Sequence, residues 1–164
     1  MSEKQYQVIK GEVKERIDRW IAQYPEDQRQ SAVMPALRIV QEVNGGYLTR
    51  ELMDEVADYL GMPPIAVYEV ATFYSMYEHK PVGRYKICMC TNISCMLRDA
   101  DDLVAYLQEK LGVGIGEVTP DGKFSIKKVE CLGACGEAPV AMIGKEYYGN
   151  LTRERLDELL DSLE

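Results

Sequence analysis

The sequence is poor in the residues that most catalytic and nucleic-acid-binding sites require. Its 164 residues include one histidine, His79, which excludes any mechanism that needs a histidine pair. Lysine and arginine number 19 against 27 acidic residues, and the resulting net charge of −8 disfavours contact with a phosphate backbone. The chain has no Walker sequence, and Gly112, Gly114 and Gly116 lack the rest of a dinucleotide fingerprint. We therefore expect neither a nucleotide site nor a nucleic-acid site on this chain.

Long apolar runs are also missing. No stretch approaches the roughly 18 apolar residues that a membrane span needs. Residues 1–6 lack the basic region and apolar core of a secretory signal. We therefore expect a cytoplasmic, soluble chain with no direct membrane insertion. Stable disulfides are rare in that compartment, so closely spaced cysteines there indicate metal or redox chemistry.

Residues 1–80 have the apolar periodicity of amphipathic helices. Three apolar stripes follow a 3.6-residue period, and Thr49 is the predicted N-cap of the third helix. Pro63 and Pro64 open a fourth segment over 65–74 that is apolar nearly all round, which indicates burial on more than one side. This half of the chain predicts a helical bundle.

Aromatic residues crowd the end of the fourth segment. Phe73, Tyr74, Met76 and Tyr77 lie within five positions of one another. We expect Phe73 to pack in the core between the two halves of the chain. The alternative is an exposed anchor for a partner protein, because aromatic residues and methionine are enriched at the centres of interfaces.

Residues 81–164 follow a different pattern, in which strands and helices alternate. Alternating or short apolar runs predict strands at 85–90, 124–129 and 139–143, and wider spacing predicts helices over 97–111 and 152–163. The order of these elements predicts a small thioredoxin-like α/β layer. The whole chain is therefore expected to be an α+β protein, a helical bundle followed by this domain.

Four cysteines carry the chemistry of the second half. They form the pairs Cys90-x4-Cys95 and Cys131-x3-Cys135, and each pair begins where a predicted strand ends. Two loops at one end of a sheet can bring four thiolates around one centre, and thiolates select zinc, copper(I) or iron–sulfur clusters. We expect the short loops to point backbone N–H groups at the sulfurs, where they offset negative charge.

Three kinds of site compete for these cysteines. Closed four-thiolate zinc sites are common, although zinc knuckles often use x2 spacing and both loops here are longer. A thiol–disulfide enzyme would carry Cys-x-x-Cys, which neither pair matches. The x4 spacing also begins the plant-type 2Fe–2S pattern, without its third cysteine. Spacing alone therefore favours an iron–sulfur centre and leaves structural zinc open.

Four ordered motifs resemble one known family, the small 2Fe–2S subunit (24 kDa subunit family) of the NADH dehydrogenase module of respiratory complex I. The motifs are Val70-Ala71-Thr72-Phe73-Tyr74, Pro81-Val82-Gly83, Cys90-Thr91-Asn92-Ile93-Ser94-Cys95, and Cys131-Leu132-Gly133-Ala134-Cys135-Gly136 followed by Ala138-Pro139. The resemblance implies a helical bundle over 1–80 that docks a partner. It also implies a thioredoxin-like ferredoxin domain over 81–164, in which Cys90, Cys95, Cys131 and Cys135 bind one 2Fe–2S cluster.

The resemblance also implies a function. The chain would be an electron-transfer subunit of NADH:quinone oxidoreductase, next to a flavoprotein subunit that carries FMN and the NADH site. It would have no catalytic residue of its own and would not oxidise NADH alone. Within the larger respiratory complex it would lie peripherally on the cytoplasmic face of the inner membrane. Alternatives are the equivalent subunit of an NAD-linked or bifurcating hydrogenase or of a formate dehydrogenase, and a zinc-stabilised interaction module.

Cys88 is a fifth cysteine outside the two pairs. On a strand it shares a face with Cys90, so a pairing of Cys88 with Cys95 is conceivable. The family motif places the ligand at Cys90, directly before the Thr-Asn loop. We therefore expect Cys88 to be a buried small hydrophobic residue.

Overall fold

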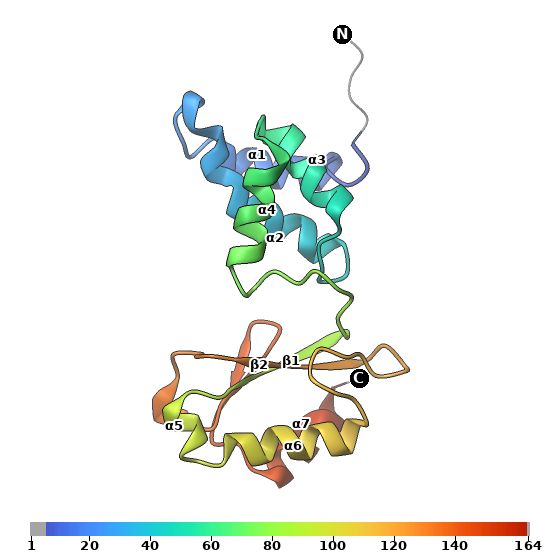
Figure 1. The fold of residues 1–164 in the computed structure, drawn as a ribbon, viewed down its shortest axis with the longest axis vertical. Helices are drawn as coiled ribbons and strands as arrows, with labels where there is room; N and C mark the ends of the chain where they lie inside the picture. Colours follow the sequence, from blue (N-terminus) through green and yellow to red (C-terminus); the bar gives the residue numbers. More distant parts are fainter. Residues whose placement is uncertain (1–5, 164) are drawn as a thin grey trace. The chain divides into compact units, whose positions relative to one another are not determined.

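The computed structural model describes residues 6–163 and divides the chain into two compact units between Pro81 and Val82. Figure 1 shows the elements of each unit, coloured along the chain. None of the helices described within this range has the length and apolar character needed to span a bilayer.

The first unit consists of helices. They are α1 (Gly11–Ile21), the 3₁₀ helix η1 (Glu26–Ala32), α2 (Val33–Val43), α3 (Arg50–Leu60) and α4 (Pro64–Phe73). Their apolar stripes meet in one core, in which the most deeply buried large side chains include Ile17, Leu37, Ile39, Val40 and Val56. The periodicity of the sequence predicted the four α-helices correctly, whereas η1 was not predicted.

The ends of α3 show how local chemistry fixes a helix. The Thr49 side chain accepts a hydrogen bond from the Leu52 N–H at 3.3 Å, which confirms the predicted N-cap. Gly61 ends the helix with φ of 71°, a conformation that glycine adopts at little cost. Pro64 then begins α4 at its first position, where a missing N–H removes no helical bond.

The expected burial of Phe73 is wrong. Its side chain is 79% exposed, and Ile65 near the start of the same helix is 63% exposed. The buried residues of α4 are Val67 and Ala71, which lie one turn apart on a single stripe. Phe73 is two positions beyond Ala71, about 200° around the helix, so it points away from that stripe. The apolar composition of α4 therefore does not correspond to burial on several sides.

The second unit is a four-stranded sheet with helices. Its strands are β1 (Tyr85–Cys90), β2 (Phe124–Val129), β3 (Ala141–Ile143) and β4 (Glu146–Tyr148), in the order β2-β1-β3-β4. β1 and β2 are parallel, whereas β1 with β3 and β3 with β4 are antiparallel. The helices are α5 (Ile93–Met96), α6 (Ala100–Leu111), the 3₁₀ helix η2 (Cys135–Glu137) and α7 (Arg153–Ser162).

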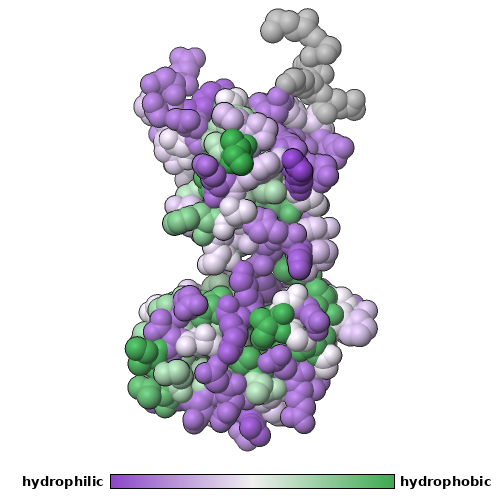
Figure 2. All heavy atoms as spheres, viewed as in Figure 1, coloured by the Kyte–Doolittle hydropathy of each residue, from purple (hydrophilic) through white to green (hydrophobic). Residues whose placement is uncertain are grey.

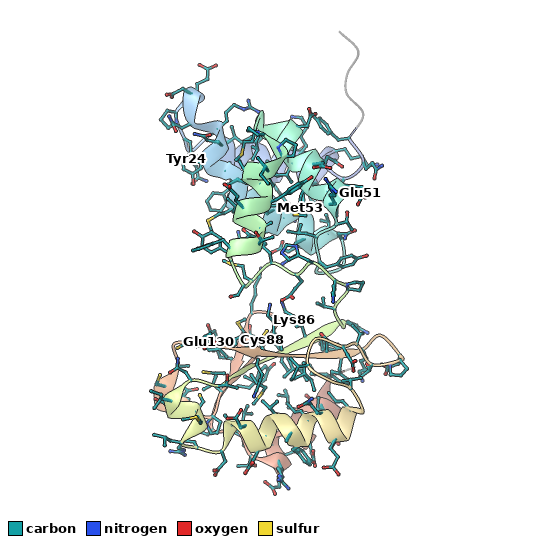
Figure 3. All side chains as sticks on the ribbon, viewed as in Figure 1. Tyr24, Glu51, Met53, Lys86, Cys88 and Glu130 are labelled. Atoms are coloured by element: carbon teal, nitrogen blue, oxygen red, sulfur yellow. The ribbon has the colours of Figure 1, made fainter. Side chains whose placement is uncertain are left out.

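The two faces of the sheet have different surroundings. Ile87, Met89 and Ile126 belong to the core that also includes residues of α6 and α7, and these two helices lie on one side of the sheet (Figure 1). Because side chains alternate along a strand, Lys86 and Cys88 lie on the opposite face (Figure 3). Cys88 is only 4% exposed, so the expected burial of this cysteine is confirmed.

Two features of this unit differ from the sequence-based expectation. The helix expected over 97–111 begins only at Ala100, because Asp99 directly before it has a φ of 64°, and the separate short helix α5 was not predicted. The stretch after β3 forms β4, a strand that its exposed tyrosine Tyr147 did not signal. The overall order of strand, helix, strand, strand and helix nevertheless agrees with the predicted architecture.

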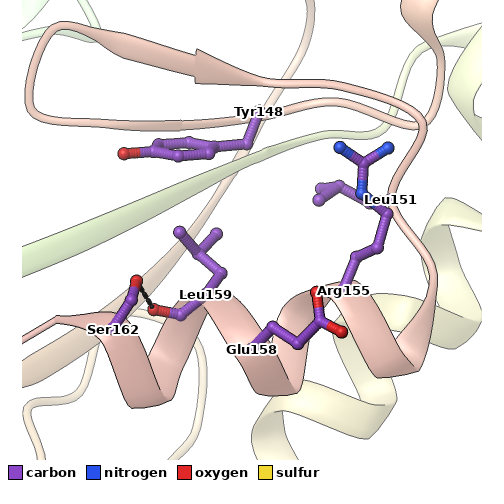
Figure 4. Close-up of a pocket in the computed structure, with 6 residues that line it drawn as sticks. All are labelled: Tyr148, Leu151, Arg155, Glu158, Leu159 and Ser162. Carbon is purple, nitrogen blue, oxygen red and sulfur yellow. Dashed lines mark hydrogen bonds between the residues drawn. The ribbon is translucent and has the colours of Figure 1, made fainter.

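A shallow pocket of about 250 Å³ lies between β4 and α7 (Figure 4). Its lining includes Arg155, whose guanidinium donates to the Asn150 carbonyl at 3.2 Å, and Ser162, whose hydroxyl donates to the Leu159 carbonyl at 2.7 Å. These polar groups are bonded to the chain itself, so we assign the pocket no ligand.

Candidate metal centre

The parallel pairing of β1 and β2 brings the two cysteine loops to the same end of the sheet. Cys90, the last residue of β1, lies opposite Val129, the last residue of β2. The Thr91 N–H donates to the Val129 carbonyl at 3.0 Å, which extends the contact beyond the strands. Cys131 follows two residues after Val129, so the first cysteine of each pair lies close to the other.

The short helix α5 folds Cys95 back toward Cys90. Asn92 caps this helix, with its side chain accepting from the Ile93 N–H at 2.7 Å. Cys95 is 2% exposed and Cys90 is 3% exposed, and both belong to a small buried cluster with Ala100 and Ala138. The first pair of thiols is therefore enclosed by protein.

The second loop is tighter and lies at the surface. Gly133 has a φ of 73°, and its N–H donates to the Cys131 sulfur at 3.3 Å. Cys135 begins η2, where the Glu137 N–H donates to the Ala134 carbonyl at 3.0 Å. Both cysteines of this loop are exposed.

Interactions between the side chains link the four cysteines. The Cys90 sulfur takes part in hydrogen bonds with the thiols of Cys95 and Cys131. Cys95 in turn interacts electrostatically with Cys90 and Cys135. The structure therefore brings together all four of the cysteines that the sequence singled out.

Backbone N–H groups also point at the buried sulfurs. Those of Asn92 and Leu132 donate to Cys90, and that of Val140 donates to Cys95. The expected donation from the short loops to sulfur is thus found. The N–H donor of Val140, the residue directly before β3, was not predicted from the sequence. Its N–H carries no sequence signal, and only its position after the Ala138-Pro139 motif hints at it.

The pKa values of the two buried thiols are shifted in opposite directions. Burial raises the pKa of Cys90, but hydrogen bonds from the Asn92 and Leu132 N–H groups and from the neighbouring thiols outweigh it, so the pKa is lowered. Burial raises the pKa of Cys95, and its contact with Cys90 raises it further. Cys90 is therefore the thiol of this pair that loses its proton first.

The donor set suits an iron–sulfur cluster, since such clusters are held by cysteine thiolates with hydrogen bonds to sulfur. Within residues 6–163 no group of three or more His, Cys, Asp or Glu side chains is arranged around a point for a single metal ion. A 2Fe–2S cluster distributes its four protein ligands over two irons, so it does not require three of them around one point.

Apolar residues surround the cysteine loops. Ile93, Met96 and Leu97 are 65%, 48% and 75% exposed, and Leu132 packs against the buried cluster that contains Cys90. This exposed group was not predicted from the sequence. Its signal was the placement of three large apolar residues around Cys95, directly before the acidic start of α6.

Comparison with known proteins agrees with this geometry. Residues 17–164 match the family model described as thioredoxin-like [2Fe-2S] ferredoxin. The chain is 46% identical over 150 residues to an NADH-quinone oxidoreductase subunit of Rhizobium meliloti (strain 1021), covering 92% of this chain and 88% of that protein. It is 45% identical over 148 residues to NADH-quinone oxidoreductase subunit 2 of Thermus thermophilus, covering 90% and 81%.

A solved structure shares the fold. It is the NAD+-reducing [NiFe]-hydrogenase in the air-oxidized state, with a TM-score of 0.69 and 21% sequence identity over 85% of this chain. This chain spans about a quarter of the hydrogenase chain, with 24% covered. At this identity the likeness extends to the fold and no further.

Proposed function

Because this chain belongs to the thioredoxin-like [2Fe-2S] ferredoxin family, we propose that it is an electron-transfer subunit of an NADH:quinone oxidoreductase. The convergence of four cysteines on one end of the sheet carries the proposal. The names of two relatives at 46% and 45% identity support the parent complex. The hydrogenase structure, at 21% identity, supports only the fold. A role as the equivalent subunit of a hydrogenase therefore has weaker support and is the second candidate.

Cys90, Cys95, Cys131 and Cys135 would hold one 2Fe–2S cluster. When bound, such a cluster takes up and releases one electron at a time. The N–H groups of Asn92, Leu132 and Val140 offset the negative charge of the buried thiolates. Exposure of Cys131 and Cys135 leaves one side of the centre at the protein surface, where electrons can enter and leave.

The nucleotide chemistry would belong to a partner. The chain lacks a dinucleotide fingerprint, so we propose that FMN and the NADH site lie on a flavoprotein subunit and that this chain alone does not oxidise NADH. Residues 1–80 would dock that partner, with Phe73 as an exposed aromatic contact. The chain would be held at the cytoplasmic face of the membrane through its complex.

Anaerobic purification of the chain, followed by metal analysis and EPR spectroscopy, tests the assignment. We expect a brown protein with about two irons, no zinc, and a rhombic EPR signal that appears on reduction with dithionite. NADH added to the chain alone should reduce no artificial acceptor. A colourless protein with one tightly bound zinc would instead identify a zinc-stabilised interaction module.

A further inference from the structure

We propose that the exposed apolar residues Ile93, Met96 and Leu97 form the docking surface for electron exchange with a redox protein whose contact area is apolar with a basic border. The inference depends on the proposed electron-transfer function and adds to it the place and chemistry of the contact. We call these three residues the apolar shoulder.

The apolar shoulder consists of large apolar side chains that are exposed to solvent. The one-turn helix α5 turns Cys95 inward, at 2% exposure, and turns Ile93 and Met96 outward. Leu97 follows directly and is 75% exposed. Figure 2 shows apolar residues gathered at the surface of the second unit on the side where Figure 1 places α5. Clustered exposure of this kind marks interaction sites.

The apolar shoulder lies beside Cys95 of the candidate centre. Ile93 and Met96 are direct or near neighbours of the buried thiol of Cys95, and Cys131 and Cys135 are themselves exposed. A partner seated on the shoulder would therefore lie near the sulfurs without displacing any buried residue. Contacts between electron-transfer proteins are typically small, so a patch of this extent is sufficient.

The charges around both cysteine loops select the partner. The acidic residues that flank the loops outnumber the basic ones, which are Arg98, Lys127 and Lys128; the acidic residues are Asp99, Asp101, Asp102, Glu130 and Glu137. Asp101 forms an ion pair with Lys128 at 2.7 Å, which leaves a negative border in excess. A basic border on the partner would complement it, because opposite charges steer association. A second copy of this chain would bring like charges together in an isologous contact.

The test measures electron transfer with the full-length, cluster-loaded chain and the flavoprotein subunit of its complex, reduced with NADH. Ile93→Glu and Leu97→Glu place a charge on the apolar shoulder. Ile115→Glu is the matched control, since Ile115 is also exposed, at 42%, and lies in the loop that bridges to Ile126. Stopped-flow spectroscopy follows cluster reduction at several protein and salt concentrations, and EPR checks that each variant retains the cluster.

We expect the two shoulder variants to slow second-order electron transfer by about tenfold or more, with unchanged EPR spectra. The control should stay within about twofold. Added salt should slow the wild-type reaction, and Asp102→Lys should weaken that dependence. If Leu97→Glu does not load iron, Leu97→Ser removes the apolar contact without adding a charge and should still slow transfer.

Unchanged rates in cluster-loaded shoulder variants would overturn the docking surface and leave the proposed function intact. Dissociation of a dimer of this chain by the same substitutions, observed by analytical ultracentrifugation, would assign the shoulder to a second copy and also overturn the inference. A wild-type chain that contains zinc and no iron would instead remove the proposed function. The EPR and metal analyses therefore separate the two kinds of failure.

Discussion

At the scale of single residues, Cys88 and Cys90 offer a direct comparison. Both are buried and share one face of β1, but the Cys90 sulfur contacts Cys95 and Cys131. Cys88 lies opposite Lys127 on β2 and Met142 on β3, within the sheet rather than at its end. We expect Cys90→Ala to abolish cluster incorporation and Cys88→Ala to retain about two irons per chain.

Iron analysis and EPR spectra of the two variants check this prediction. Cys88→Ala removes one buried sulfur and should cost no more than about 1 kcal/mol of unfolding free energy, because the cavity is small. Loss of iron from Cys88→Ala with retention in Cys90→Ala would exchange the roles of the two cysteines.

Gly83 is a second residue on which the fold depends. It precedes β1, and its N–H donates to the Ser125 hydroxyl at 3.0 Å. A Cβ at this position would lie 2.3 Å from the Phe124 carbonyl carbon and 2.6 Å from the Ser125 nitrogen, both backbone atoms of β2. We expect Gly83→Ala to reduce the unfolding free energy by about 1–3 kcal/mol, because the added methyl group would push the backbone at position 83 away from β2.

Chemical denaturation of the two glycine variants measures this difference. Gly136→Ala is the matched control, because a Cβ there meets no atom within 4 Å. The control should change the unfolding free energy by less than about 0.5 kcal/mol. Equal destabilisation by the two substitutions would contradict the argument from close approach.

At the scale of elements, one cluster of hydrogen bonds connects α6 to α7. The Asp157 carboxylate accepts from the Tyr106 hydroxyl at 2.6 Å and from the Lys110 ammonium at 2.5 Å. The bond from Lys110, followed by that from Tyr106, lowers the pKa of Asp157 below its ordinary 3.8. A carboxyl with a lowered pKa stabilises the fold above its unfolded pKa, and this contribution is lost as the pH falls through the folded value.

We therefore expect Asp157→Asn to lower the melting temperature at neutral pH, by an amount that shrinks as the pH falls below 3.8. The effect is small, since the carboxylate is at the surface. Glu158→Gln removes the same charge from the same helix and leaves both bonds to Asp157 in place. Thermal unfolding across this pH range compares the three proteins, and an Asp157→Asn difference that is constant with pH would contradict the link.

Local sequence patterns predicted the helices and strands better than they predicted which side chains are buried. The cap at Thr49 was predictable because one side chain and the nearby N–H groups determine it. The exposure of Phe73 was not, because composition does not show which stripe of α4 meets the core. The break at Asp99 was missed for a related reason: a left-handed φ at a non-glycine residue leaves little trace in an apolar pattern.

The candidate centre was partly predictable from the sequence, because part of it depends on local spacing. The spacing within each pair identified the four cysteines, and the strand-to-loop transitions indicated that the loops share one sheet end. The donor from Val140 and the exposed apolar shoulder depend on tertiary placement, which a single sequence does not determine.

At the scale of the whole molecule, the cysteines and their surroundings belong to one of the two units. All four cysteines and the N–H donors of Asn92, Leu132 and Val140 lie within residues 82–164. This unit has its own core, formed by the sheet with α6 and α7. The helical unit has a separate core in which Ile17 and Val56 are fully buried.

We therefore expect a chain that begins at Val82 to fold, to take up about two irons, and to give the same reduced EPR signal as the full chain. Because the shortened chain keeps the apolar shoulder but lacks residues 1–80, it should bind the flavoprotein subunit more weakly than the full chain in a pull-down experiment, although its spectrum is normal. The helical unit would then strengthen assembly, and the sheet unit would carry the cluster and the contact for electron exchange. A shortened chain that folds but holds no iron would show that cluster binding needs the helical unit. One that binds the flavoprotein as tightly as the full chain would show that residues 1–80 contribute nothing to docking.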